Sequence, residues 1–103
     1  MEPMLDRLTV AMFAEQIGKT FRLQLADGPA LELVLVEARN LSLPPGNSGP
    51  RRDPFSLLFR GPKAPMLPQR IYPLENEAFG RLEIFLVPIG ADADGVKYEA
   101  IFN

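Results

Sequence analysis

The chain contains no cysteine and no histidine among its 103 residues. Without cysteine, its own side chains cannot form a disulfide, a zinc–thiolate site or an iron–sulfur cluster. Without histidine, it lacks the commonest general base and the commonest ligand of transition metals. Any catalysis would depend on carboxylates, lysine, arginine, tyrosine or hydroxyl groups, so we expect neither enzymatic activity nor a bound cofactor.

Long hydrophobic runs are also missing. No unbroken apolar stretch approaches the roughly 18 residues that span a bilayer, and residues 1–4 lack the basic start of a secretory signal. We therefore expect a cytoplasmic protein that does not contact a membrane. With 103 residues, of which 47% are hydrophobic and 23% charged, the chain is predicted to fold as a single domain over residues 1–103.

The charges are unevenly distributed, although the net charge is only −2. Residues 51–70 are mainly basic, whereas residues 75–99 are mainly acidic. Such a bipolar chain can attract an oppositely charged partner or a second copy of itself, although charged segments are most often solvated surface. The candidate interaction surface consists of the basic residues Arg51, Arg52, Arg60, Lys63 and Arg70. The negative net charge argues against nucleic acid as the partner.

Hydrophobic periodicity predicts one helix followed by strands. Val10, Phe13 and Ile17 have helical spacing between Thr9, a suitable N-cap, and Gly18, a suitable stop. After Gly18 the period changes to two, and the predicted strands are residues 21–25, 31–37, 55–60, 71–74, 82–89 and 97–103. Short connections favour antiparallel neighbours. The predicted fold is mainly β: a small six-stranded antiparallel barrel or sandwich with one short N-terminal helix.

Two of these strands are apolar on both faces. Residues 31–37 therefore require a cover, such as the helix, or a bend that changes the inner face. Residues 82–89 alternate two apolar sets, Leu82, Ile84 and Leu86 on one face and Phe85, Val87 and Ile89 on the other. One set must form the core, and the other must meet the helix or a partner. An exposed side chain from this second face would mark an interface.

Other features have simpler explanations than a catalytic or metal site. Residues 92–95 (Asp-Ala-Asp-Gly) resemble the start of a calcium loop but lack its remaining ligands, and a hairpin turn explains them better. Glu83 and Glu99 alternate with apolar residues and should face outward, with Arg81 and Lys97 as cross-strand ion partners. Pro73 suggests that its strand lies at an edge or a bulge. The proline- and glycine-rich residues 43–54 are predicted to form a long loop.

Four segments are distinctive together: residues 55–62 (FSLLFRGP), 67–69 (LPQ), 82–90 (LEIFLVPIG) and 94–103 (DGVKYEAIFN). With the opening at residues 8–21, they resemble a family of uncharacterised bacterial proteins of about one domain. Members of this family occur beside proteins similar to phage tail-collar and tail-fibre components. The resemblance implies a stand-alone β-domain without an assigned activity and supplies no catalytic residues.

Two functions from different classes follow. The first is a non-catalytic protein-interaction or structural domain of a bacterial assembly, such as a phage-tail-like structure, which would bind a protein partner or a second copy of the chain. The alternative is a small-ligand-binding barrel whose interior or mouth forms the pocket. Large residues predicted to point inward count against this alternative because they would fill the interior: Phe21, Phe59, Leu86 and Phe102.

Overall fold

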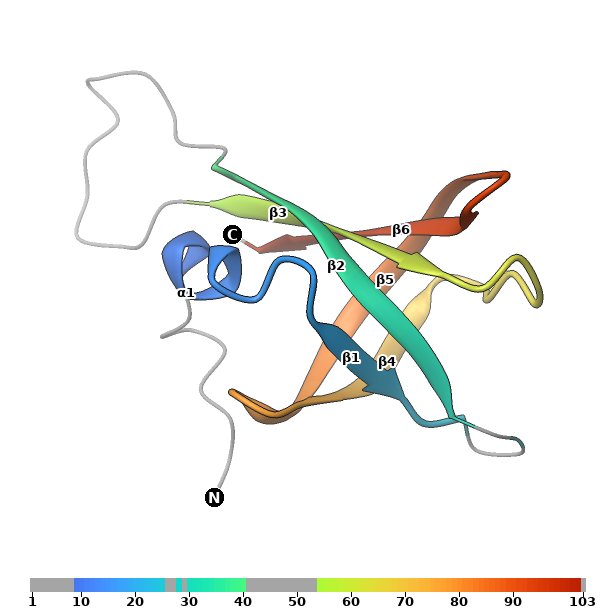
Figure 1. Ribbon diagram of the computed structural model, residues 1–103, viewed down its shortest axis with the longest axis horizontal. Coiled ribbons are helices and arrows are strands. Elements are labelled where there is room, and N and C mark those ends of the chain that lie inside the picture. The colour runs from blue at the N-terminus through green and yellow to red at the C-terminus, as the bar shows by residue number, and fades with distance from the viewer. Residues whose placement is uncertain (1–8, 26–27, 29, 41–53, 103) are drawn as a thin grey trace.

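The computed structural model describes residues 9–25, 28, 30–40 and 54–102, which contain one helix and six strands (Figure 1). The elements are α1 (Val10–Ala14), β1 (Thr20–Leu23), β2 (Leu31–Asn40), β3 (Phe55–Gly61), β4 (Arg70–Asn76), β5 (Gly80–Asp92) and β6 (Gly95–Phe102). The strands form a closed barrel in the order β1–β2–β3–β6–β5–β4, and all neighbouring strands are antiparallel. The predicted β-fold with a short helix is confirmed, and of the two predicted architectures the structure has the barrel.

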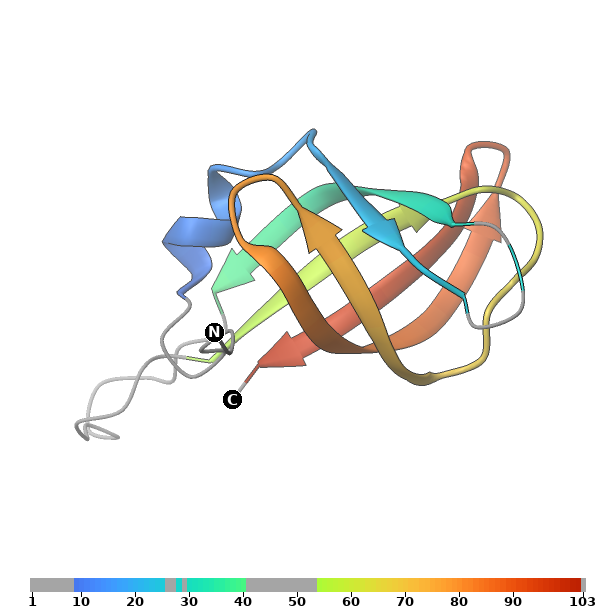
Figure 2. The same cartoon turned by 90° about the horizontal axis from the view of Figure 1, so that it is seen from below.

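The barrel consists of two three-stranded meanders. The first meander is β1–β2–β3, the second meander is β4–β5–β6, and they join where β3 pairs with β6 and β1 with β4 (Figure 2). Exchanging β1 with β4, β2 with β5 and β3 with β6 leaves the strand order unchanged, so the topology has an approximate two-fold relation. Each middle strand has a register shift against its third strand, between Leu35 and Glu37 in β2 and between Pro88 and Gly90 in β5. Such bulges bend a strand, as expected for residues 31–37.

The two seams between the meanders differ in length. β3 and β6 pair continuously from Phe55↔Phe102 to Gly61↔Val96. β1 and β4 pair only at Arg22↔Glu75 and Leu23↔Leu74. The expectation that the strand of Pro73 lies at an edge is wrong, because β4 pairs on both sides.

Proline is tolerated in β4 because its backbone faces the short seam. The carbonyl oxygen of Pro73 accepts a hydrogen bond from the backbone N–H of Gln24, with a nitrogen–oxygen distance of 3.4 Å. The backbone groups of Pro73 therefore point to β1, where few ladder bonds exist. The missing N–H of Pro73 removes no hydrogen bond between β4 and β5.

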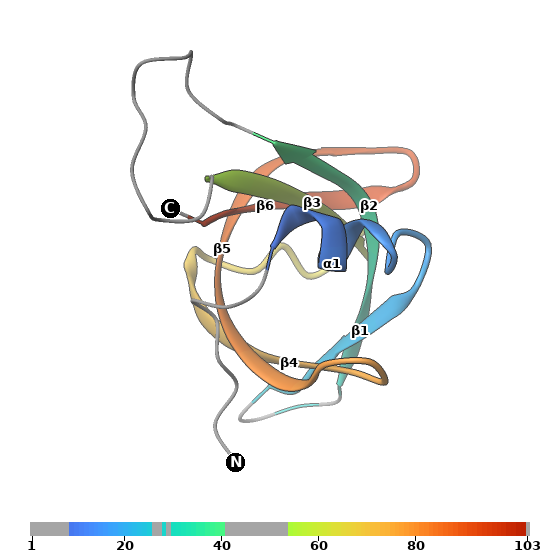
Figure 3. The same ribbon diagram turned by 90° about the vertical axis from the view of Figure 1, so that its left-hand side faces the viewer.

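Helix α1 lies over one end of the barrel (Figure 3). The Oγ1 atom of Thr9 accepts a hydrogen bond from the backbone nitrogen of Met12 at 3.3 Å, which confirms the predicted N-cap. The helix ends at Ala14 rather than near Gly18, because residues 15–18 form a turn. Gly18 has a φ of +89°, which reverses the chain into β1. Of the predicted apolar stripe, Phe13 is buried, whereas Ile17 is 45% exposed.

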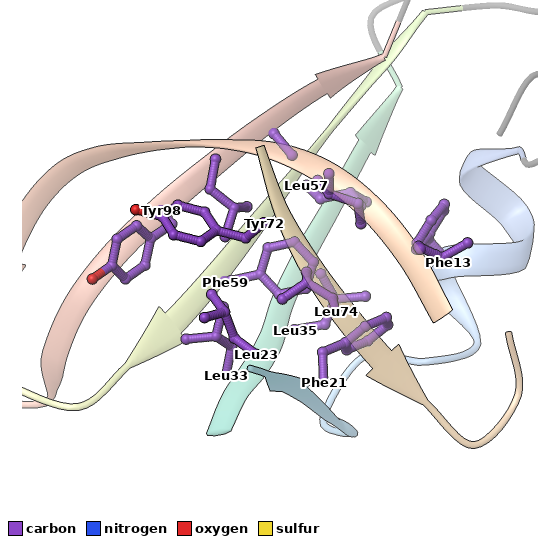
Figure 4. Packing of buried hydrophobic residues seen from close by; sticks show 14 of the residues in the cluster. Phe13, Phe21, Leu23, Leu33, Leu35, Leu57, Phe59, Tyr72, Leu74 and Tyr98 are labelled. Atoms are coloured by element: carbon purple, nitrogen blue, oxygen red, sulfur yellow. The ribbon is translucent and has the colours of Figure 1, made fainter. Parts of the chain in front are cut away.

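The inner faces of the strands form one hydrophobic core (Figure 4). Beneath α1 this core is aromatic: the ring centroid of Phe13 lies 4.9 Å from that of Phe79, 5.6 Å from that of Phe102 and 5.7 Å from that of Phe55. The residues expected to point inward are all buried: Phe21, Phe59, Leu86 and Phe102. Phe55 and Tyr72 are buried as well, so neither ring can stack on a nucleic-acid base.

The other end of the barrel is closed by residues 62–69, which connect β3 to β4. Leu67 from this connection is buried. The hydroxyl of Tyr98 accepts a hydrogen bond from the Leu67 backbone nitrogen at 3.0 Å, and the Tyr72 hydroxyl donates one to the carbonyl oxygen of Pro68 at 2.5 Å. Figure 4 shows both tyrosines at the end of the core that lies away from Phe13. Side chains thus fill the interior from end to end, which weighs against a ligand pocket inside the barrel.

Candidate interaction surface

The second meander exposes large hydrophobic side chains on its outer face. Ile71 of β4 and Phe85 of β5 form a direct ladder pair, and they are 61% and 49% exposed. Ile101 of β6 is 56% exposed, and Ile89 at the β5 bulge is 52% exposed. We call Ile71, Phe85, Ile89 and Ile101 the outer apolar face. Three of these side chains, those of Ile71, Phe85 and Ile101, point outward because their neighbours on the same strands supply the core: Tyr72, Ile84, Leu86, Ala100 and Phe102.

The sequence predicts that an exposed member of the set Phe85, Val87 and Ile89 marks an interface, and the structure exposes two of its three members. The helix does not cover this set, because α1 packs against β2 of the first meander. The outer apolar face is therefore open to solvent within the part of the chain that the structure describes.

The corresponding positions of the first meander are mostly polar. The ladder pair Phe21↔Leu33 of the first meander corresponds to Tyr72↔Ile84 of the second meander. The adjacent ladder pair Thr20↔Val34 therefore corresponds to Ile71↔Phe85. Similarly, Arg60 and Ile101 are the second-last residues of β3 and β6. The barrel therefore accommodates the row Thr20, Val34 and Arg60 at positions where the second meander has three large hydrophobic side chains. Closing the barrel does not require those hydrophobic residues.

β5 and β6 separate beside the outer apolar face. Their last ladder pair toward the α1 end is Val87↔Glu99, and Phe85 and Ile101 lie two residues beyond it on their strands. Beyond this pair β6 continues toward the C-terminal end, while β5 curves toward its hairpin with β4 (Figures 1 and 3). In the first meander the equivalent pair, Val34↔Arg60, is closed.

The predicted basic surface is divided among distant parts of the barrel. Arg51 and Arg52 lie outside the described residues. Arg60 lies on β3, opposite Val34 on one side and Lys97 on the other. Lys63 follows in the connection to β4 and Arg70 begins β4, a strand separated from β3 by β6 and β5. A role of these residues in binding stays a prediction.

The acidic hairpin has the structure expected of a turn. The Oδ1 atom of Asp92 accepts a hydrogen bond from the backbone nitrogen of Asp94 at 2.9 Å, and its Oδ2 atom lies 3.1 Å from Nζ of Lys97. The Asp94 N–H, and after it Lys97, lower the pKa of the Asp92 carboxyl. No group of three potential metal-ligating side chains occurs among the residues that the structure describes.

The two glutamates face outward as predicted, but their ion partners differ from those expected. Glu83 lies 3.8 Å from Arg81, which is on the same strand rather than across from it. Lys97 pairs with Asp92 instead of Glu99. Glu99 stands between Val87 and Leu58 in the ladders of β6.

A groove with a volume of about 840 Å³ follows the seam between β1 and β4. Its walls carry both signs of charge, including Lys19, Arg22, Glu32, Glu75 and Glu77. Sequence reasoning missed this groove because its residues come from segments far apart in the chain and look individually like ordinary solvated positions. In the described part of the chain, no polar side-chain atom is buried without a partner.

Asn76 lies at the end of this groove and connects its walls. The Asn76 Oδ1 atom accepts hydrogen bonds from the backbone nitrogens of Ala78 at 2.7 Å and Phe79 at 3.1 Å. Its Nδ2 atom donates to Oε1 of Gln16 at 3.3 Å and to the carbonyl oxygen of Thr20 at 3.4 Å. Asn76 therefore has a structural role that accounts for its burial.

The fold and surface define a small antiparallel β-barrel domain with a filled interior. The chain matches a family model over residues 8–102, described as "Domain of unknown function (DUF6916)". Because the match covers nearly the whole chain, the protein belongs to this family. No curated protein and no solved structure matched it. The resemblance to an uncharacterised small-domain family is confirmed, while the proximity to phage tail proteins stays a prediction. Among the described residues, no helix is long and apolar enough to cross a membrane.

Proposed function

We propose that this domain is a non-catalytic protein-interaction module that binds another protein through the outer apolar face of its second meander. The observation that carries the proposal is the exposure of Ile71, Phe85 and Ile101 at positions whose counterparts in the first meander are mostly polar. The absence of cysteine and histidine supports the non-catalytic part of the proposal.

The outer apolar face alone supports only weak binding. Fully burying an exposed Phe or Ile side chain contributes about 1.5–3 kcal/mol, and about half of each side chain is still available for burial here. Each residue would therefore contribute about 1 kcal/mol, before the cost of association is subtracted. A partner must make further contacts to bind stably.

The setting of the interaction rests on the family resemblance. A bacterial assembly, such as a phage-tail-like structure, would contain the protein partner of this non-catalytic module. A location in the cytoplasm is part of the same proposal.

Small-ligand binding is the second candidate function. The filled interior argues against a pocket inside the barrel, whereas the charged groove at the β1–β4 seam is open. A ligand would therefore bind at this groove rather than within the core.

The proposal is tested by comparing variants of the two meanders in a capture experiment from the source cell. We expect the immobilised wild-type domain to retain a specific protein, Phe85→Ser to lose most of it, and the matched Val34→Ser variant to retain it. Light scattering at low and high salt would show whether the captured protein is a second copy of the chain. Equal capture by Phe85→Ser and the wild type would reject the outer apolar face as the binding surface.

A further inference from the structure

We propose that the partner binds by strand addition, in which an extended segment pairs antiparallel with the free edge of β5 at residues 81–85. The inference rests on the proposed function and adds how the partner is held and what its sequence contains. Main-chain hydrogen bonds would provide the contacts that the outer apolar face lacks, and alternate side chains would provide specificity.

The direction of the β5 backbone groups follows from Pro73. In an antiparallel strand the N–H and C=O of one residue point to the same side, and successive residues alternate. Because the carbonyl of Pro73 points to β1, those of its neighbours Tyr72 and Leu74 point to β5. Their partners, Ile84 and Leu82, therefore bond to β4, while Glu83 and Phe85 direct their N–H and C=O groups away from β4.

On that side, no strand of the described residues pairs with β5 at residues 81–85. The β6 ladder stops at Val87↔Glu99, and in the described part of the chain residues 81–85 have ladder partners in β4 alone. Both residues lie on the exposed stretch of β5. An edge with free N–H and C=O groups is a template for an added strand.

The side chains along this edge specify the occupant. The outward residues of the edge are, in order, Arg81, Glu83 and Phe85. Directly opposed residues on antiparallel strands are stabilised by opposite charges and by apolar pairs. An antiparallel partner segment therefore carries an apolar residue opposite Phe85, a basic residue opposite Glu83 and an acidic residue opposite Arg81. The partner is an extended peptide segment with the outward pattern apolar–basic–acidic at alternate positions.

A second copy of the chain fits this edge less well. Two β5 edges that pair antiparallel over residues 81–85 place Glu83 directly opposite Glu83 of the other copy. Like charges at opposed positions are destabilising. A register shifted by two residues pairs Arg81 with Glu83 of the other copy, but it places Phe85 opposite Phe79, a turn residue whose ring centroid lies 4.9 Å from that of Phe13. Neither register of two β5 edges satisfies all three positions, which favours a different protein as the occupant.

Hydrogen exchange in the free protein, followed by NMR, tests the edge without a partner. We expect the amide hydrogens of Glu83 and Phe85 to exchange at least tenfold faster than those of Ile84 and Leu86, which face β4. Val34, the counterpart of Phe85 in a closed ladder, should exchange slowly. Equal protection of Phe85 and Ile84 in the monomer would show that the edge is already occupied and would overturn the proposal.

Binding is tested with the peptide acetyl-Thr-Ile-Val-Lys-Val-Glu-Thr-amide, which has the inferred pattern. We expect this peptide to slow amide exchange at Glu83 and Phe85. N-methylation of its Ile and Lys amides should weaken binding at least tenfold, since these N–H groups face β5. A control peptide with Lys and Glu exchanged should bind several-fold more weakly. No binding at millimolar peptide, or equal binding of the N-methylated form, would overturn strand addition.

The outcomes separate this inference from the proposed function. Loss of partner capture by Phe85→Ser, with no effect of the peptide on the β5 amides, would leave the interaction module standing and reject strand addition. Unchanged capture by Phe85→Ser would reject the proposed function itself. A mass of two chains together with protected Glu83 and Phe85 amides would identify a second copy as the occupant and overturn the inferred partner.

Discussion

The two meanders of the barrel have the same topology and similar inner faces but different outer faces. Inside, Leu33 of the first meander corresponds to Ile84 of the second, and both are buried. Outside, Val34 corresponds to Phe85. The ladder of β2 with β3 includes Val34, whereas the ladder of β5 with β6 ends before it reaches Phe85. The core requires hydrophobic volume from both halves equally. The outer faces are free to differ, and their difference identifies the surface that barrel closure does not explain.

The connections within the meanders differ as well. The second meander turns between β5 and β6 through a tight hairpin at Asp92↔Gly95, whereas β2 and β3 are separated by residues 41–54. Gly95 has a φ of +138° and lies against the backbone of Gly61, the last residue of β3. The second meander thus depends on a close approach to the first at this point.

The largest expected effect tests whether the inner faces of the two meanders contribute equally to the stability of the core. We expect Leu33→Ala and Ile84→Ala each to lower the free energy of unfolding by about 2–5 kcal/mol, because each leaves a cavity in a shared core. Urea unfolding monitored by circular dichroism measures both variants. If one substitution costs less than about 1 kcal/mol, that meander does not share the core equally, and the comparison fails.

A somewhat smaller effect is expected at the tight hairpin. Gly95→Ala would strain the backbone and place a Cβ atom against the Gly61 carbonyl oxygen, and we expect a loss of about 2–3 kcal/mol. Gly80→Ala is a matched control, because Gly80 also has a positive φ of +73°. Apart from its chain neighbours, no described residue has an atom within 4 Å of a Cβ added there. This control should cost about 1 kcal/mol, from backbone strain alone. Equal losses in thermal unfolding would show that the contact with Gly61 is unimportant.

The connection between the meanders should contribute less. We expect Tyr98→Phe to cost about 1–2 kcal/mol in urea unfolding, because it leaves the buried N–H of Leu67 without its acceptor. Tyr72→Phe should cost about 1 kcal/mol, since it removes only the donor to the Pro68 carbonyl. Burial raises the pKa of the Tyr72 hydroxyl above 10.0. The contribution of the neutral Tyr72 hydroxyl to the free energy of unfolding should therefore be complete below pH 10. It should decrease as the pH rises through the raised pKa of the folded protein. A stable Tyr98→Phe variant would contradict this role of the connection.

The smallest expected effect concerns the charge pair of the β5–β6 hairpin. In the folded protein the pKa of the Asp92 carboxyl lies below its ordinary value of 3.8. Its ionised form therefore stabilises the fold fully above pH 3.8. This stabilisation is lost as the pH falls through the lowered folded pKa. We expect Asp92→Asn to reduce the pH dependence of unfolding below about pH 4, because it removes the carboxylate that the Asp94 N–H and Lys97 stabilise. Identical acid transitions for Asp92→Asn and the wild type would contradict the turn interactions.

Local signals in the sequence predicted local structure well. Thr9 as the N-cap, the alternation in β5 and the turn at residues 92–95 each depend on neighbours within a few residues, and all three are confirmed. The end of the helix was not predicted correctly, because the turn after Ala14 is fixed by bonds to a distant strand. The Gly18 N–H donates to the Leu35 carbonyl oxygen, and the Leu35 N–H donates to the Lys19 carbonyl oxygen.

Long-range features were not predictable from the pattern. The two-fold relation of the meanders leaves no repeat in the sequence, because Phe21 and Tyr72, or Leu33 and Ile84, fill equivalent positions with different side chains. The alternation in β5 showed that one apolar set needs a cover, but it could not show that the helix covers β2 instead. The free edge of β5 depends on where β6 diverges, which no local pattern encodes.

The short seam between β1 and β4 gives the barrel a preferred line of local opening. Two ladder pairs, the bond from Gln24 to Pro73 and the bond from Asn76 to Thr20 hold it, whereas the seam of β3 and β6 is paired along all of β3. Regions with few such bonds open with a smaller free energy than global unfolding. We therefore expect local opening to separate β1 from β4 first, which would leave a curved open sheet in which β3 and β6 remain paired.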